Sequence, residues 1–225
     1  MKTGFWQVTF AILRKDMLAE IRSRELLSVM GLFALLSVLI FSFALEMDRE
    51  ARETAISGVI WVTVAFASII GLNRSMSSER EQGSFDALLL APVDRSALFL
   101  GKFLGNFVVV LLVGLILLPL GTLLYNITLI TPWVLVILVL GIFGISTTGT
   151  LLAAMTAQTR ARDALLSIAM LPIVLPVLLA SVRATTSIIS GDPTDLWISW
   201  PQILLVMDVI YMVLCFFTFG FIIEE

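Results

Sequence analysis

Long apolar runs alternate with short polar stretches along the chain, and most of the runs are as long as a transmembrane helix. A helix needs about 20 apolar residues to cross the hydrocarbon core of a bilayer. Six runs approach or exceed this length, which predicts an all-α, polytopic integral membrane protein with six transmembrane helices. The predicted spans are residues 26–45, 55–73, 103–125, 133–157, 164–182 and 203–223.

The pattern adds one helix before the first span. Residues 4–25 combine a broad apolar side with charged residues off it, which favours an amphipathic helix in the headgroup layer; the alternative is a plain extension of the first span. No internal repeat or domain boundary is visible, so residues 1–225 are predicted to form a single membrane domain. The apolar side of the helix consists of Phe5, Trp6, Phe10, Leu13, Met17, Leu18 and Ile21.

Lysine and arginine predict the orientation, because cytoplasmic loops of multi-pass proteins carry an excess of them. With the N-terminus inside, most of the 14 basic residues fall in the inside segments 1–25, 73–102 and 158–163. Both termini are therefore predicted to be cytoplasmic. On the outer side, residues 183–190 are compatible with a short helix on or in the outer leaflet.

The polar stretch between the second and third spans predicts a structured turn rather than a slack linker. Residues 77–82 can continue the preceding helix, and Gly83 is a natural left-handed stop for it. Ser84 can cap a new short helix, with Asp86 in its first turn near the positive end of the helix dipole. Pro92 ends this helix because it cannot continue the hydrogen-bond ladder.

The short helix has one apolar face, made by Phe85, Leu88 and Leu89 at helical spacing. An exposed apolar face needs a partner, and we interpret this helix as a docking element for a soluble protein. The alternative is a tightly packed cytoplasmic turn. Asp94 or Ser96 can cap the helix that follows.

Composition restricts the chemistry that this chain can perform. It is 59% hydrophobic and 14% charged, with a mean hydropathy of +1.05, so little remains for a soluble catalytic domain. A net charge of −3 without a basic cluster argues against binding nucleic acid. The chain has no histidine, and its one cysteine, Cys215, lies in an apolar run. These counts argue against a disulfide framework, a cysteine-based metal site and common catalytic triads.

Two further chemistries lack a recognisable motif. Gly101-Lys102 has no glycine at the upstream position that a phosphate-binding loop requires, so ATP is not expected to bind here. The carboxylates Glu79, Glu81, Asp86 and Asp94 match no metal-ligand spacing, and no metal site is predicted. They leave open one rival, an integral-membrane lipid-modifying enzyme.

Three residues inside the spans are candidates for a pathway or a gate. Pro172 and Pro176 free backbone carbonyls and bend the fifth span, which suits either a moving helix or a static kink. Asp208 is the one acid within an apolar run, where a charge is costly. Because Asp208 is five positions after Ile203, we expect it in the outer third of the bilayer, as a hydrated or hydrogen-bonded acid or as part of a pathway.

Residues 79–102, EREQGSFDALLLAPVDRSALFLGK, resemble the cytoplasmic signature of ABC-2-type permeases and, more closely, that of the CcmB family. CcmB proteins are haem-exporter permease subunits in cytochrome c maturation. The resemblance assigns the segment to coupling with an ATPase. The implied ATPase-coupling residues are Glu79, Arg80, Glu81, Gly83, Phe85, Asp86, Leu88, Leu89, Pro92, Asp94 and Arg95.

The resemblance also implies partners and a cargo. The partners are a CcmA-like ATPase dimer that binds ATP, CcmC-like and CcmD-like membrane subunits, and a CcmE-like haem chaperone, all at the bacterial inner membrane. Haem is a possible transported substrate, and no cofactor is assigned to this chain. Its own haem ligands would be a methionine, Tyr125, Tyr211 or Cys215, all weaker candidates than a histidine on a partner. We therefore expect a mechanical subunit that is not itself an enzyme.

Two other functions fit the same motif. One is an ABC-2-type permease for a lipid, a drug or a polysaccharide. The other is a passive membrane scaffold without a moving part.

Overall fold

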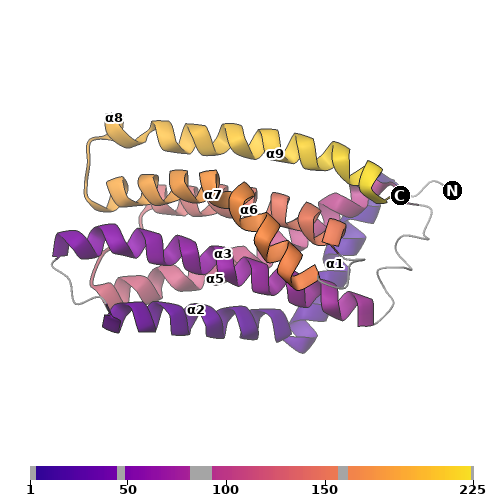
Figure 1. The fold of residues 1–225 in the computed structure, drawn as a ribbon, viewed down its shortest axis with the longest axis horizontal. Helices are drawn as coiled ribbons and strands as arrows, with labels where there is room; N and C mark the ends of the chain where they lie inside the picture. The colour runs from indigo at the N-terminus through magenta and orange to yellow at the C-terminus, as the bar shows by residue number, and fades with distance from the viewer. Residues whose placement is uncertain (1–3, 45–48, 82–92, 157–161, 224–225) are drawn as a thin grey trace.

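The computed structural model describes residues 4–44, 49–81, 93–156 and 162–223, and all its regular elements in these ranges are helices. Six long helices run side by side along the long axis of the molecule, and α1 lies at one end of this bundle (Figure 1). The elements are α1 (Phe5–Ser23), α2 (Glu25–Ala44), α3 (Arg49–Glu81), α5 (Arg95–Tyr125), α6 (Pro132–Thr156), α7 (Arg162–Ile189), α8 (Thr194–Trp197) and α9 (Ser199–Ile223).

The prediction of an all-α protein with six spans is confirmed. Six helices are long and apolar enough to cross a membrane, and each contains one predicted span almost entirely. α1 and the last turns of α9 lie at the same end of the bundle, as an even number of spans requires (Figure 1). The cytoplasmic placement of that end stays a prediction.

Several helices extend beyond the apolar runs. As predicted, α3 continues past residue 73, to Glu81, and α5 begins well before residue 103, at Arg95 directly after its cap Asp94. The idea of a separate short helix at residues 183–190 is wrong, because α7 runs without a break to Ile189. This extension is held by packing: Ala184 and Thr185 are buried, and the Thr185 hydroxyl accepts a hydrogen bond of 3.0 Å from the Trp61 indole on α3.

Small residues allow the helices of the core to approach closely. Gly141 on α6 faces the Trp61 ring and the Ser181 side chain, and a methyl group in its place would overlap both. Gly114 on α5 faces Leu138 and Ile142 on α6 in the same way. Small residues at helix contacts allow this close approach in membrane proteins. α3 and α6 occupy the centre, and the exposed sides of α2 and α9 are apolar, as in helices that face lipid.

α1 turns its apolar side outward. Trp6, Phe10 and Ile21 are exposed, although each lies on the side with the large apolar residues. The opposite side, with Val8 and Ile12, is buried against α5. Because aromatic residues favour the membrane interface, this exposed side is what the predicted headgroup-layer helix requires.

Candidate functional site

The segment predicted to dock a partner is flanked by the last turns of α3 and the first turns of α5. These two helix ends, with α1 packed across them, are the described part of the candidate site. The predicted coupling residues that lie outside the described residues are Gly83, Phe85, Asp86, Leu88, Leu89 and Pro92, together with the side chains of Arg80 and Glu81.

A buried lysine lies at the centre of this junction. Lys102, in the second turn of α5, is only 4% exposed. Its Nζ atom donates to Oδ2 of Asp16 on α1 at 3.1 Å and also to Oε1 of Glu79 on α3. One ammonium group therefore bridges carboxylates from two other helices. Removing a charge from water is costly, and these two ion pairs compensate Lys102 for the loss of hydration.

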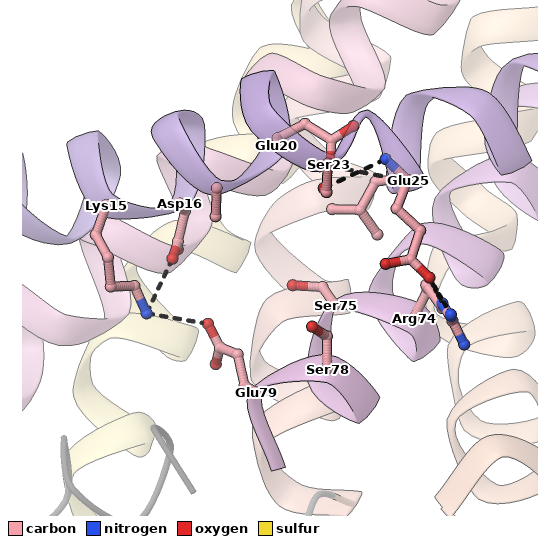
Figure 2. Close-up of a pocket in the computed structure, with 11 residues that line it drawn as sticks. Lys15, Asp16, Glu20, Ser23, Glu25, Arg74, Ser75, Ser78 and Glu79 are labelled. Atoms are coloured by element: carbon pink, nitrogen blue, oxygen red, sulfur yellow. Dashed lines mark hydrogen bonds and ion pairs between the residues drawn. The ribbon is translucent and has the colours of Figure 1, made fainter. Parts of the chain in front are cut away.

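A second lysine completes the cluster. The Nζ atom of Lys15 lies 3.1 Å from Oδ1 of Asp16 and 3.4 Å from Oε1 of Glu79 (Figure 2). We call Lys15, Asp16, Glu79 and Lys102 the junction cluster. Its two cations and two carboxylates balance, and they join α1, α3 and α5. Lys15 differs from Lys102 in having 43% of its side chain exposed.

Close packing of α1 on α5 places the charged residues within reach of one another. Gly101 faces Ile12 so closely that a Cβ atom at Gly101 would lie 2.8 Å from the Ile12 Cβ. The Thr9 hydroxyl, also on α1, donates to the Ala97 carbonyl on α5 at 3.2 Å. Since side chains four residues apart share a helix face, this contact brings Asp16 beside Lys102.

A polar pocket of about 160 Å³ lies beside the junction cluster, between α1, α2 and α3 (Figure 2). The buried Glu20 carboxylate accepts hydrogen bonds from the backbone N–H groups of Leu26 at 3.2 Å and Leu27 at 2.8 Å, and so caps α2. Glu25 pairs with Arg74 of α3 across the pocket. The first three helices are therefore tied together at this end by charged groups.

Asp94 starts α5, as one of the two predicted caps. Its Oδ1 atom accepts a hydrogen bond of 2.9 Å from the Ser96 backbone N–H, while its backbone is extended. The beginning of α5 is thus fixed two residues after Pro92. Arg95 is the first residue of the helix.

The predicted proline bend lies within α7, which stays continuous through Pro172 and Pro176 and curves in its middle (Figure 1). The Tyr211 hydroxyl on α9 donates a hydrogen bond of 2.9 Å to the Ile173 carbonyl, between the two prolines. A neighbouring helix thus supports the backbone of the bend, as expected in a membrane.

Asp208 lies far from the junction cluster in sequence and has no hydrogen-bond partner among the described residues, although it is only 4% exposed. α9 begins at Ser199, so Asp208 is nine residues into the helix, about 13 Å along its axis. The acid is therefore farther from the helix end than the span boundary at Ile203 suggested. The expectation of a hydrogen-bonded acid is not met by the described part of the chain.

Of the junction cluster, only Glu79 was a predicted site residue. Lys15 was expected only on the polar side of the amphipathic helix 4–25, Lys102 was seen only as part of the motif 79–102, and Asp16 was not singled out. The available signal was Lys102 itself: a lysine within an apolar helix needs an acidic partner, and the nearest acids are on neighbouring helices.

The chain is similar in sequence to a known protein family and to several named proteins. A sequence model of the family described as CcmB protein matches residues 7–224. A Pseudomonas aeruginosa protein named Heme exporter protein B is 27% identical over 180 residues, which cover 80% of this chain and 80% of that protein. A Rhodobacter capsulatus protein of the same name is 28% identical over 172 residues, or 75% of this chain and 78% of that protein.

A further relative has a different name. The Probable ABC transporter permease protein NosY of Pseudomonas aeruginosa is 32% identical over 144 residues, which cover 61% of this chain and 52% of that protein. The family match extends over nearly the whole chain, and it confirms the resemblance seen in residues 79–102. This multi-pass membrane protein belongs to the CcmB family.

Proposed function

We propose that this chain is the permease subunit of an ABC transporter for cytochrome c maturation in the bacterial inner membrane. A separate CcmA-like ATPase dimer binds and hydrolyses ATP, and this chain couples the hydrolysis to haem export or to release of a haem-loaded CcmE-like chaperone. CcmC-like and CcmD-like subunits complete the complex. Membership of a family whose relatives are named Heme exporter protein B supports this function.

The observation that carries the coupling role is the junction cluster. Residues 82–92 connect α3 to α5, and the cluster joins these same two helices to α1 just inside the connection. A push on the connection therefore moves the ends of α3 and α5 together instead of bending one against the other. Closure of the ATPase dimer on nucleotide would then bias a two-state arrangement of the spans.

The aromatic and sulfur side chains of the spans suit a mechanical subunit better than a haem ligand. The Tyr211 hydroxyl is bonded to the Ile173 carbonyl, and the Tyr125 hydroxyl lies 3.5 Å from the Val38 carbonyl. Cys215 is buried in the contact between α9 and α5. We therefore assign the haem-ligating groups to partner subunits and the transmission of force to this chain.

Co-purification of the ATPase tests the docking step. We expect Leu88→Asp to abolish retention of the ATPase on the membrane subunits, because it places a charge on the apolar face of the predicted docking helix. Thr159→Asp is the matched control, since it adds the same charge to the other predicted cytoplasmic loop. Normal retention of the ATPase by Leu88→Asp, at wild-type levels of the chain, would overturn the docking assignment.

The rate of ATP hydrolysis separates a coupled permease from a passive scaffold. A permease changes the ATPase rate when it joins the complex, and variants of the junction cluster reduce that change while the ATPase stays bound. An ATPase rate indifferent to this chain would favour the scaffold. Chelator-sensitive lipid modification by the purified chain would favour the enzyme.

The similarity to NosY supports one second candidate, an ABC permease with another cargo. Release of haem-loaded chaperone by the reconstituted complex distinguishes the two. ATP-dependent release supports the haem function, whereas hydrolysis without release favours the other cargo.

A further inference from the structure

A groove on the outside of the bundle, between α6 and α9, is almost entirely apolar. Its volume is about 270 Å³, and its walls come from Leu140 and Phe143 on α6 and from Leu205, Val209, Met212 and Val213 on α9. The exposure of Leu205 and Val209 places its mouth on the side of the molecule that faces lipid. Its one ionisable lining residue is Asp208.

Asp208 lies at the inner edge of this groove without a hydrogen-bonding partner in the described part of the chain. Its carboxyl group is against Gly144 of α6, where an added Cβ would lie 2.7 Å from Oδ1 and 3.2 Å from Val177 Cγ2. The nearest hydroxyl on the same helix face, that of Tyr211, is already bonded to the Ile173 carbonyl. A buried carboxyl group in these surroundings is stabilised by a partner that brings a positive charge or a hydrogen-bond donor.

We propose that the groove is a binding site for a small lipophilic amine that enters from the bilayer. The ammonium group would pair with the Asp208 carboxylate, and the alkyl or aromatic part would lie against the apolar walls. Such an ion pair in apolar surroundings is a strong, charge-assisted contact. The inference is independent of how an ATPase docks, because it rests on α6 and α9 alone.

Two other occupants fit the groove less well. The amine of a phospholipid headgroup stays near the interface, whereas Asp208 is about 13 Å along α9 from the helix start. A transmembrane helix is 10–12 Å across with its side chains and too large for the groove. The volume lies just under the roughly 300–1,000 Å³ of small-molecule sites, which favours a compact ligand.

Binding of decylamine to the full chain in lipid nanodiscs tests the proposal. We expect saturable binding to the wild type, and affinity at least about tenfold lower in Asp208→Asn, which keeps the shape of the side chain and removes its charge. Decanol and decanoate measure partitioning into lipid and should not distinguish the two proteins. Asp195→Asn is the matched control, because it removes a carboxylate exposed on α8, away from the groove.

A second variant keeps the experiment decisive if Asp208→Asn folds poorly. Gly144→Ala retains the carboxylate and places a methyl group against Oδ1, so we expect it to weaken decylamine binding as well. Thermal unfolding of each variant verifies the fold. Equal binding of decylamine by the wild type, Asp208→Asn and Gly144→Ala would overturn the proposal, as would equal binding of decanol and decylamine by the wild type.

Discussion

The junction cluster and the α6–α9 groove both bury ionisable side chains in an apolar protein, but only those of the cluster have partners of opposite charge. In the cluster, two lysines and two carboxylates from three helices lie within ion-pair distance of one another. In the groove, Asp208 has no partner among the described residues.

The presence or absence of partners within the chain distinguishes a structural ion-pair cluster from a candidate binding site. A charge whose partners come from other helices of the same chain holds those helices together, and its removal leaves the partners uncompensated. A buried ionisable group without a partner does not hold helices together, and its replacement by an apolar side chain removes a desolvation cost. Substitutions in the two regions should therefore change stability with opposite signs.

The largest effect is expected from the buried lysine of the cluster. Lys102→Met keeps the length of the side chain but removes the buried cation that Asp16 and Glu79 share, and leaves them only the partly exposed Lys15. We expect the free energy of unfolding in mixed micelles to fall by about 3–5 kcal/mol, the usual result of breaking a buried ion pair from one side. Far-UV circular dichroism during denaturant titration measures it.

A double variant checks that charge, and not packing, causes this loss. Adding Glu79→Gln to Lys102→Met removes one of the uncompensated carboxylates and should restore about 0.5–3 kcal/mol of the lost stability. Purely additive losses would show that the cluster is not energetically coupled.

The sequence predicted the spans well because their length and apolarity are local properties. It missed the end of α7, because contacts between distant residues decide where that helix ends. α7 continues past residue 183 to Ile189 because Ala184 and Thr185 pack in the core, where the Thr185 hydroxyl accepts a hydrogen bond from Trp61. The local sequence of residues 183–190 does not predict this contact with Trp61. Asp94 was predictable as a cap because capping is local.

Contacts between distant residues also explain why the sequence predicted only part of the candidate site. Glu79 and Lys102 were visible in a motif, but their pairing with α1 depends on Gly101, which lets that helix approach α5. The unpartnered state of Asp208 is likewise a property of the assembled helices. The sequence identified Asp208 as an unusual acid in an apolar run, but it did not predict which residues surround it.

Replacing the unpartnered acid of the groove should increase the stability of the chain. We expect Asp208→Leu to raise the free energy of unfolding of the ligand-free chain by about 1–3 kcal/mol, because it removes a buried carboxyl group that lacks a hydrogen bond. Asp195→Leu, at an exposed position of α8, should change it by less than about 0.5 kcal/mol. A loss of stability in Asp208→Leu would mean that the carboxylate has a partner within the chain.

The hydroxyl group that supports the bend in α7 should have a smaller effect. Tyr211→Phe removes its hydrogen bond to the Ile173 carbonyl, and we expect a loss of about 0.5–1.5 kcal/mol in the same titration. Tyr125→Phe is the matched control, since the hydroxyl of Tyr125 lies 3.5 Å from the Val38 carbonyl, at the limit of a hydrogen bond. An equal loss of unfolding free energy in both variants would show that the hydrogen bond at the bend contributes no more than the one at Tyr125.

The smallest effect should come from the exposed lysine of the cluster. Lys15 contacts the same two carboxylates as Lys102, yet 43% of its side chain is exposed, so water already screens its charge. We expect Lys15→Met to lower the free energy of unfolding by about 0.2–1 kcal/mol at low salt. This loss should vanish near 1 M salt, where the Debye length is about 3 Å, whereas the effect of Lys102→Met should persist. If both losses respond to salt alike, then burial does not distinguish the two lysines, and the cluster is a surface network instead of a buried joint.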